Sequence, residues 1–313
     1  MSNMCMDLNL LNVYGTEEDQ GRPRSTSPIR GTTASSPEPI ADYGNLTLID
    51  LSVNNLSGFI PDRIGELSKL EVLILSSSNL NGGIPANFSN IATLSRFVAN
   101  QNNFSGPIPG GLTRYNKLKG PLSGQLANLR HLQVMKLEFN KLSGEIPTQF
   151  WQLQVLYVLN ISCNSLTGSI PSSISYLQTL TNLYLQGINF SGMIPNSISY
   201  MGSLIELQLG ESHLSGKIPM MPTKLQIALN LSSDLFEGFI PDKTSLTQLI
   251  LSNNQLSGEV PKFGSYVSVN ISGNPNLRNV TTPNISPELA ASMTLSMSRS
   301  FDRVNYDDEQ IYD

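Results

Sequence analysis

One stretch of the chain decides the fold: Leu156-Tyr157-Val158-Leu159-Asn160-Ile161-Ser162-Cys163-Asn164-Ser165-Leu166-Thr167-Gly168-Ser169-Ile170-Pro171. Its Leu159-Asn160-Ile161 segment alternates as a β-strand does, with the outer two side chains buried. Its Ile-Pro end recurs at a basic spacing of 24 residues, at Ile60-Pro61, Ile84-Pro85, Ile108-Pro109, Ile146-Pro147, Ile170-Pro171, Ile194-Pro195, Ile218-Pro219, Ile240-Pro241 and, as Val, at Val260-Pro261. Such a period predicts a solenoid, in which each repeat contacts only its neighbours.

An Asn follows most of the predicted strands, and the chemistry of a tight turn explains it. The Asn amide both donates and accepts, so it can bond backbone groups in its own turn and in the next coil. The structural Asn residues predicted on this basis are Asn54, Asn102, Asn140, Asn164, Asn254 and Asn274. Ser78, Ile188, Ser212 and Asp234 stand at equivalent positions, and looser turns are expected at Ser78, Ile188 and Ser212.

The repeat matches the pattern L-x-x-L-x-L-x-x-N-x-L of leucine-rich repeats. Its Ser-Gly-x-Ile-Pro segment, as in Leu142-Ser143-Gly144-Glu145-Ile146-Pro147, resembles the plant-specific class found in the ectodomains of receptor-like kinases and receptor-like proteins. The resemblance covers residues 45 to about 277. It implies an α/β-type leucine-rich repeat solenoid, a right-handed curved superhelix with a concave parallel β-sheet and convex loops or 3-10 turns. It also implies recognition of peptides, small hormones or co-receptors at the cell surface.

The spacing is irregular at two places. Pro109 and Pro147 are 38 residues apart, so one repeat lacks its strand near residues 119–120. Because strands must lie about 4.7–4.9 Å apart to pair, we expect Phe97–Ala99 to pair directly with Met135–Leu137, leaving an enlarged convex loop near 110–131. A kink that splits the sheet is the alternative. After Pro219 the spacing falls to 22 and then 20 residues, as if segments had been deleted.

The two ends differ from the repeats in composition. Residues 1–43 are predicted to be a disordered segment, 44–277 the repeat domain, and 278–313 a mostly disordered acidic tail. The first residues lack the features of a signal peptide, and no apolar run has the length of a membrane-spanning helix. Members of the family that this chain resembles carry Cys pairs before the first repeat and often after the last one. This chain has only Cys5 and Cys163. Location at the cell surface therefore rests on resemblance alone.

The chain contains many Asn-x-Ser/Thr sequons. The candidate glycosylation sites are Asn45, Asn55, Asn87, Asn103, Asn189, Asn279 and Asn284. Asn160, Asn230 and Asn270 also begin sequons, but they are expected on the concave face, where a glycan would obstruct a ligand. Two explanations stay open: a secretory history, or a by-product of the repeat consensus.

Composition gives no indication of catalysis. His131 and His213 lie in different repeats without Cys or carboxylate partners at metal-ligand spacing, so neither a metal nor a cofactor is expected. Neither the phosphate-binding loop nor the catalytic motifs of a kinase are present, so the kinase domain of the resembled proteins is absent from this sequence. The net charge of −5 argues against a nucleic-acid partner.

The solvent face of the predicted sheet is the candidate binding surface. Exposed aromatic residues beside isolated charges are typical of recognition surfaces, although an ordinary solvated sheet face is the alternative. The candidate ligand-binding residues are Arg96, Val98, Lys136, Glu138, Phe139, Tyr157, Tyr184, Glu206 and Gln208, with Asn182 and Glu211 also facing outward. Lys136, Glu138, Phe139, Tyr157 and Tyr184 form the preferred group because they lie on adjacent repeats.

These observations favour a non-enzymatic binding module that recognises a peptide or protein ligand, with a co-receptor as a further partner. Two alternatives stay open. One is a truncated paralogue or gene-model fragment without independent function. The other is an extracellular inhibitor of microbial wall-degrading enzymes, which would need the caps and signal peptide that this sequence lacks.

Overall fold

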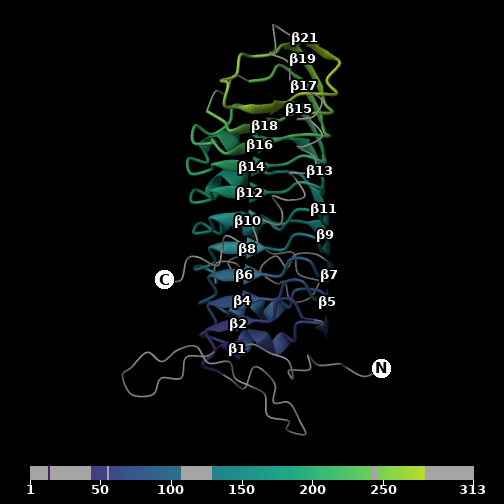
Figure 1. Ribbon diagram of the computed structural model, residues 1–313. Coiled ribbons are helices and arrows are strands. Elements are labelled where there is room, and N and C mark those ends of the chain that lie inside the picture. Colours follow the sequence, from purple (N-terminus) through teal and green to yellow (C-terminus); the bar gives the residue numbers. More distant parts are fainter. Residues whose placement is uncertain (1–12, 15–43, 55, 107–128, 242–244, 279–313) are drawn as a thin grey trace, which may run out of the picture.

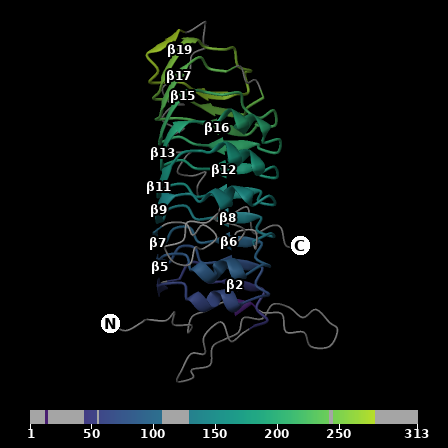
Figure 2. The same cartoon turned by 180° about the vertical axis from the view of Figure 1, so that it is seen from behind.

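The chain folds into a column of stacked coils with two long parallel sheets along its sides. The computed structural model describes residues 13–14, 44–54, 56–106, 129–241 and 245–278. Each coil adds one strand to each sheet, and the coils succeed one another in chain order along the column (Figure 1). Seen from behind, the strands of one of the two sheets follow one edge of the column (Figure 2). The solenoid predicted from the period is confirmed.

The first sheet, here called the concave sheet, contains the strands predicted from the Leu-x-Leu segments. Its strands are β2 (Leu48–Asp50), β4 (Val72–Ile74), β6 (Arg96–Val98), β8 (Val134–Lys136), β10 (Val158–Asn160), β12 (Asn182–Tyr184), β14 (Glu206–Gln208), β16 (Ala228–Asn230), β18 (Gln248–Ile250) and β20 (Ser268–Asn270). An eleventh strand, β1 (Val13–Tyr14), pairs antiparallel with β2. Part of the N-terminal segment that the sequence predicts to be disordered thus extends the first edge of the sheet.

The second sheet, here called the lateral sheet, was not predicted. All but the last of its strands contain the Gly of a Ser-Gly step or of the equivalent Asn-Gly, Thr-Gly or Glu-Gly step. They are β3 (Ser57–Gly58), β5 (Asn79–Gly82), β7 (Asn103–Gly106), β9 (Lys141–Glu145), β11 (Ser165–Gly168), β13 (Asn189–Met193), β15 (His213–Lys217), β17 (Leu235–Gly238), β19 (Gln255–Glu259) and β21 (Asn276–Arg278). The Gly in these strands has a positive φ, for example +84° at Gly144 and +105° at Gly168, which a residue without Cβ adopts at little cost.

The irregular spacing after Pro109 leaves both sheets continuous. Strands β6 and β8 pair in parallel, with Phe97 opposite Met135, as the sequence predicts. In the lateral sheet β7 pairs with β9 in the same way. The predicted convex loop near 110–131 falls mainly on residues 107–128, outside the described residues. Both sheets therefore stay paired across the irregular spacing, and the alternative of a split sheet is wrong.

Short 3-10 helices on the convex side complete the core. They are η3 (Asp62–Glu66), η4 (Ala86–Asn90), η6 (Thr148–Gln152), η7 (Ser172–Tyr176) and η8 (Asn196–Tyr200), and each begins directly after the Pro of an Ile-Pro pair. Proline suits this place because its fixed φ leads into a helix and its missing N–H is not needed there. Ile174 and Ile198 of η7 and η8 are fully buried against Leu side chains of the strands.

The Asn residues after the strands connect neighbouring coils. The Asn164 Nδ2 donates to the carbonyls of Ile161 and Ser162 in its own turn, and to Leu137 in the preceding coil, at 2.9–3.0 Å. The Asn164 Oδ1 accepts from the N–H of Leu142 in that same coil at 3.0 Å. The same four kinds of bond are made by Asn102, Asn140, Asn254 and Asn274. Asn54, in the first repeat, bonds within its own turn, to the carbonyls of Leu51 and Ser52, and has no bond to another coil among the described residues.

The turns lacking Asn keep the same backbone conformation, so the expectation of looser turns there is not met. The residue before the Asn position has φ of +55° at Ser77, +65° at Gly187 and +59° at Glu211, against +52° at Cys163 in a turn with Asn. The N–H of each of these residues donates to a carbonyl of the next coil, which holds the turn without the side chain. The buried Oγ atoms of Ser78 and Ser212 have no hydrogen-bond partner within the described part of the chain.

We predict that Asn164→Ala lowers the free energy of unfolding by about 3 kcal/mol, because buried backbone groups of two coils lose their partner. Asn54→Ala is the matched control: among the described residues its amide bonds only its own turn, so we expect a loss of about 1 kcal/mol. Urea unfolding followed by circular dichroism measures both values. Equal losses in the two variants would contradict a stabilising role for the bonds between coils.

Candidate functional site

The register of the concave sheet places the outward side chains in two rows. The first row passes through Val98, Lys136, Asn160, Tyr184 and Gln208, which are successive pairing partners from β6 to β14. The second row passes through Arg96, Val134, Val158, Asn182 and Glu206. Four strand spacings, about 19 Å, separate Arg96 from Glu206. The candidate residues therefore share one face, although they do not meet at one point.

Three of the candidate residues are less accessible than the sequence predicts. Val98 and Lys136 are 8% exposed and Glu138 is 6% exposed, so the expectation of a solvent-facing position is wrong for them. On the inner side of a curved stack, side chains of neighbouring strands converge and cover one another. Alternation along a strand shows which way a side chain points, but it does not show how closely its neighbours approach.

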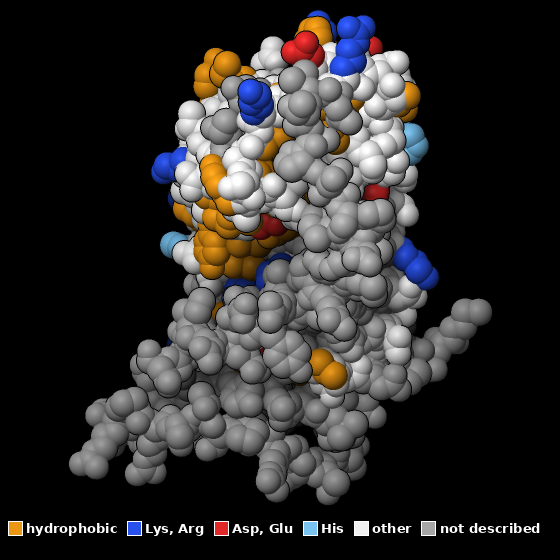
Figure 3. Space-filling view, turned by 45° about the horizontal axis from the view of Figure 1, so that its top comes forward, with side chains coloured by type: hydrophobic (Ala, Val, Ile, Leu, Met, Phe, Trp, Pro, Cys, Tyr) orange, Lys and Arg blue, Asp and Glu red, His pale blue; other side chains and the backbone are white. Residues whose placement is uncertain are grey.

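The aromatic candidates Phe139 and Tyr157 remain accessible, at 41% and 39% exposure. Phe139 lies in the turn after β8 with a φ of +55°, while Tyr157 lies directly before β10. They therefore flank the concave sheet at opposite ends of its strands. Figure 3 shows one face of the molecule, on which hydrophobic side chains gather beside acidic and basic ones at a hollow in the surface.

Tyr184, Asn182, Glu206 and Gln208 form a hydrogen-bonded network across β12 and β14. The Glu206 Oε2 accepts from the Tyr184 hydroxyl at 2.6 Å and from the Asn182 Nδ2 at 2.9 Å, and its Oε1 accepts from the Gln208 Nε2 at 3.0 Å. Burial and the adjacent Glu206 carboxylate raise the pKa of the Tyr184 hydroxyl, which therefore stays protonated and donates. Three donors hold this half-buried carboxylate in one orientation, which prepares it to accept from a ligand.

Two buried carboxyl groups on the concave side have raised pKa values. Burial raises the pKa of Glu138 to about 7, against the opposing effect of Lys136, and its Oε2 has no hydrogen-bond partner among the described residues. Asp234 stands at an Asn position and accepts from the N–H of Leu214 at 2.9 Å, while burial raises its pKa to about 7. Asp cannot donate as Asn does, so the sequence pattern alone could have indicated Asp234 as an unusual site.

The Asn side chains of the sequons on the concave strands make hydrogen bonds within the protein. The Asn160 Oδ1 accepts from both the N–H and the Oγ of Ser162, and Asn230 is bonded to Ser232 in the same way. Asn270 makes equivalent bonds to Ser272. Asp50 makes the same pair of bonds to Ser52 without any sequon. The Asn-x-Ser spacing at these positions therefore serves the exit of the strand, which supports the by-product explanation for these three.

The other sequons lie elsewhere on the surface. Asn45, Asn103 and Asn189 are exposed, and Asn87 is half-buried in η4. Asn103 and Asn189 begin β7 and β13 of the lateral sheet. Asn55, Asn279 and Asn284 lie outside the described residues. Because Asn103 and Asn189 belong to the lateral sheet, glycans on them would be compatible with a ligand on the concave face.

No metal site or membrane span is found among the residues that the structure describes. His131 and His213 are exposed in separate repeats, and no group of three His, Cys, Asp or Glu side chains gathers within the described ranges. Cys163 has a free thiol whose pKa is raised, chiefly by burial. Over the same ranges, no helix has the length and apolar character needed to cross a bilayer.

Comparison with known proteins agrees with this architecture. The family described as Leucine Rich Repeat matches residues 45–67, 69–91, 131–153, 155–177 and 245–265. The chain is a leucine-rich repeat solenoid. A search of curated proteins finds no match. Among solved structures, this leucine-rich repeat solenoid is similar to the ectodomains of plant receptor kinases.

Three of these structures illustrate the similarity. The ectodomain of the plant membrane receptor kinase GASSHO1/SCHENGEN3 from Arabidopsis thaliana, in complex with CASPARIAN STRIP INTEGRITY FACTOR 2, has a TM-score of 0.63 and 28% identity over 79% of this chain and 32% of its own. The PEPR1–AtPEP1 complex has a TM-score of 0.66 and 31% identity over 76% and 32%. The Arabidopsis receptor kinase HAESA, with the peptide hormone IDA and the co-receptor SERK1, has 0.61 and 29% over 76% and 43%. The solenoid thus spans about a third to two fifths of these ectodomains.

We predict that the stability of the protein falls as pH rises from about 4.5 to 7, in part because of Glu138. Its pKa is raised from 4.5 on folding, so the folded state favours the neutral carboxyl and loses stability as that group ionises. Glu138→Gln should remove about 2–3 kcal/mol of this loss, leaving the part due to Asp234. Unfolding free energies at pH 4.5 and 7.5 measure the effect. An unchanged difference between the two pH values in Glu138→Gln, or an equal change in the exposed control Glu145→Gln, would contradict the prediction.

Proposed function

We propose that the concave face binds a peptide or protein ligand at the cell surface, and that the protein acts in recognition and signalling and not as an enzyme. The observation that carries this proposal is the network of Tyr184, Asn182, Gln208 and Glu206, a fixed set of polar groups on an otherwise regular sheet. Structures solved with peptide ligands are among those to which the solenoid is similar, which supports the same class of ligand.

The chemistry of the surface suits an extended peptide lying across the strands. From Phe139 beside β8 to Gln208 on β14 there are three strand spacings, or about 14 Å, which is the length of about four extended residues. Phe139 and Tyr157 offer apolar contact area beside β8 and β10, and Glu206 on β14 offers a preorganised acceptor two strands further along the sheet. A short ligand segment could thus contact an aromatic side chain and the acceptor together, which is the composition of a binding hot spot.

A co-receptor is the second partner that we propose. One of the similar structures was solved with a peptide hormone and a co-receptor together, and the same similarity supports our proposal of a location at the cell surface. The remaining candidate residues, Arg96, Val98, Lys136 and Glu138, are assigned to the margin of the ligand site. Because Val98, Lys136 and Glu138 are buried, we assign them to the support of the surface and not to direct contact with the ligand.

We predict that Tyr157→Ala and Tyr184→Ala each weaken binding of a peptide at least tenfold, because each removes aromatic contact area and Tyr184→Ala also releases Glu206. The probe is a peptide selected from a displayed random library against the unmodified protein, with affinity measured by isothermal titration. A library that yields no concave-face binder would contradict the proposed function.

Tyr176→Ala and Tyr200→Ala are the matched controls. Both tyrosines are exposed and belong to the convex elements η7 and η8, away from the concave sheet. They should leave the affinity unchanged. If the convex pair weakens binding and the concave pair does not, the ligand binds elsewhere and the assignment of the site is wrong.

A further inference from the structure

The connectors on the convex side lose apolar residues toward the C-terminal end of the column. In a regular repeat, Ile174, Leu177 and Leu180 follow the Ile-Pro pair, and all three are fully buried. After Pro219 the spacing is two residues shorter, and the buried apolar residues of this connector are Met221, Pro222 and Leu225. Between Pro241 and Leu246 the sequence contains no apolar residue, and Leu246 alone remains. The connector after Pro241 thus contributes one buried apolar side chain, where a regular connector contributes three.

The strands of these same repeats remain regular, so the space behind them is not reduced. Strands β14, β16 and β18 pair in register, and Leu229 and Leu249 occupy their inward positions as in every other coil. No 3-10 helix occurs in the described residues after η8. The distance between strands is set by backbone hydrogen bonds, so the coils cannot close together to make up for missing side chains.

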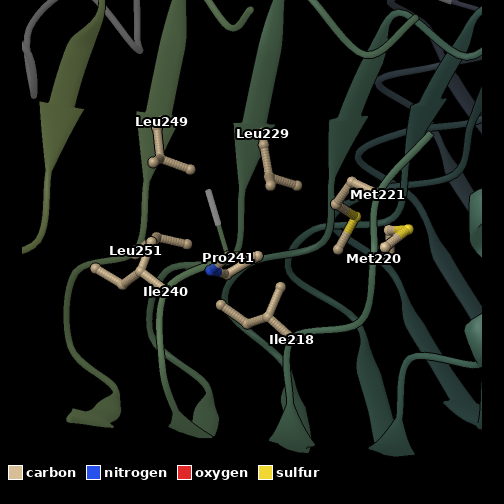
Figure 4. A pocket seen from close by; sticks show the side chains of 8 residues that line it. All are labelled: Ile218, Met220, Met221, Leu229, Ile240, Pro241, Leu249 and Leu251. Atoms are coloured by element: carbon tan, nitrogen blue, oxygen red, sulfur yellow. The ribbon is translucent and has the colours of Figure 1, made fainter. Parts of the chain in front are cut away.

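A cavity lies among the described residues of these repeats. Its volume is about 320 Å³, and its walls are aliphatic and methionine side chains, including Ile218, Met221, Leu229, Ile240 and Leu249. Figure 4 shows Leu229 and Leu249 reaching from their strands toward the residues of the opposite wall, with Met220 and Met221 together at one side. Met220 is 80% exposed, whereas the leucines of the wall are almost fully buried, so Met220 marks the side that is open to solvent.

We propose that this cavity binds a small, uncharged, apolar molecule, or the hydrocarbon part of an amphiphile, on the opposite side of the coil from the concave ligand site. Among the described residues the lining consists of apolar side chains, and none of these offers a side-chain hydrogen bond or a charge to a polar ligand. The volume lies at the lower end of the range for small-molecule sites, roughly 300–1,000 Å³. Apolar walls that lack contacting atoms lower stability, so occupation of the cavity by hydrocarbon is favourable.

The two methionines explain how such a molecule could reach buried leucines. Met is unbranched and has three rotatable bonds, so it adapts its shape to irregular apolar ligands more readily than Leu or Ile. Met220 and Met221 follow Pro219 directly and belong to the shortened connector. Rotation of these two side chains opens the cavity without breaking any strand pairing.

The test uses N-phenyl-1-naphthylamine, an uncharged apolar dye whose fluorescence rises in apolar surroundings, and the full chain labelled with ¹³C at the methionine methyl groups. We expect saturable binding of one dye per chain and a rise in melting temperature. We also expect shifts of the Met220 and Met221 methyl resonances on titration. Saturable binding without shifts at these two residues, or no binding up to the solubility limit of the dye, would overturn the proposal.

Met221→Trp fills the cavity with a larger apolar side chain. It should weaken dye binding at least tenfold. The matched control is Met193→Trp on the exposed lateral sheet, which should bind the dye as the unmodified protein does. If Met221→Trp does not fold, the methionine resonances of the unmodified protein still decide the outcome. Equal weakening in both variants would show that the dye binds elsewhere and would contradict the assignment of the site.

Discussion

The bond between the Asn amide and the neighbouring coil is the interaction on which the rest of the structure depends. A coil cannot bury its own apolar side chains, so it is stable only against another coil at a fixed distance and in a fixed register. Asn164 sets both, because one side chain donates to carbonyls of two coils and accepts from an N–H of one of them. Repetition of this bond from Asn102 to Asn274 keeps the Leu side chains of successive strands in line.

The stack tolerates defects where backbone bonds can replace the side chain. At Ile188 and Ser212 the turn keeps its conformation, because the N–H of the preceding residue still reaches the next coil. The irregular spacing after Pro109 is tolerated for the same reason, since β6 and β8 pair directly. The shortened connectors differ. They leave both sheets intact but remove core side chains, and backbone hydrogen bonds cannot fill the resulting space.

Side chains of the concave face have two different roles, which depend on where they lie along the curved sheet. In the middle of the sheet, side chains such as Lys136 and Asn160 are buried among their neighbours and support the surface. At the ends of the strands, Phe139 and Tyr157 stay accessible. Glu206 combines both properties, because its neighbours fix its carboxylate while it remains half-buried. Recognition on such a surface depends on the exposed edge and on the few polar groups that the centre holds in place.

The sequence by itself determined the solenoid, the strands of the concave sheet and the direct pairing across the missing strand. A period of 24 residues and the Leu-x-Leu alternation depend only on local spacing, which a sequence displays directly. The tertiary structure alone decided the lateral sheet, the burial of Lys136 and Glu138, the Tyr184–Glu206 network and the cavity behind Leu249. Each of these depends on how closely residues of different coils approach one another. That distance is set by stacking and curvature, which no single repeat contains.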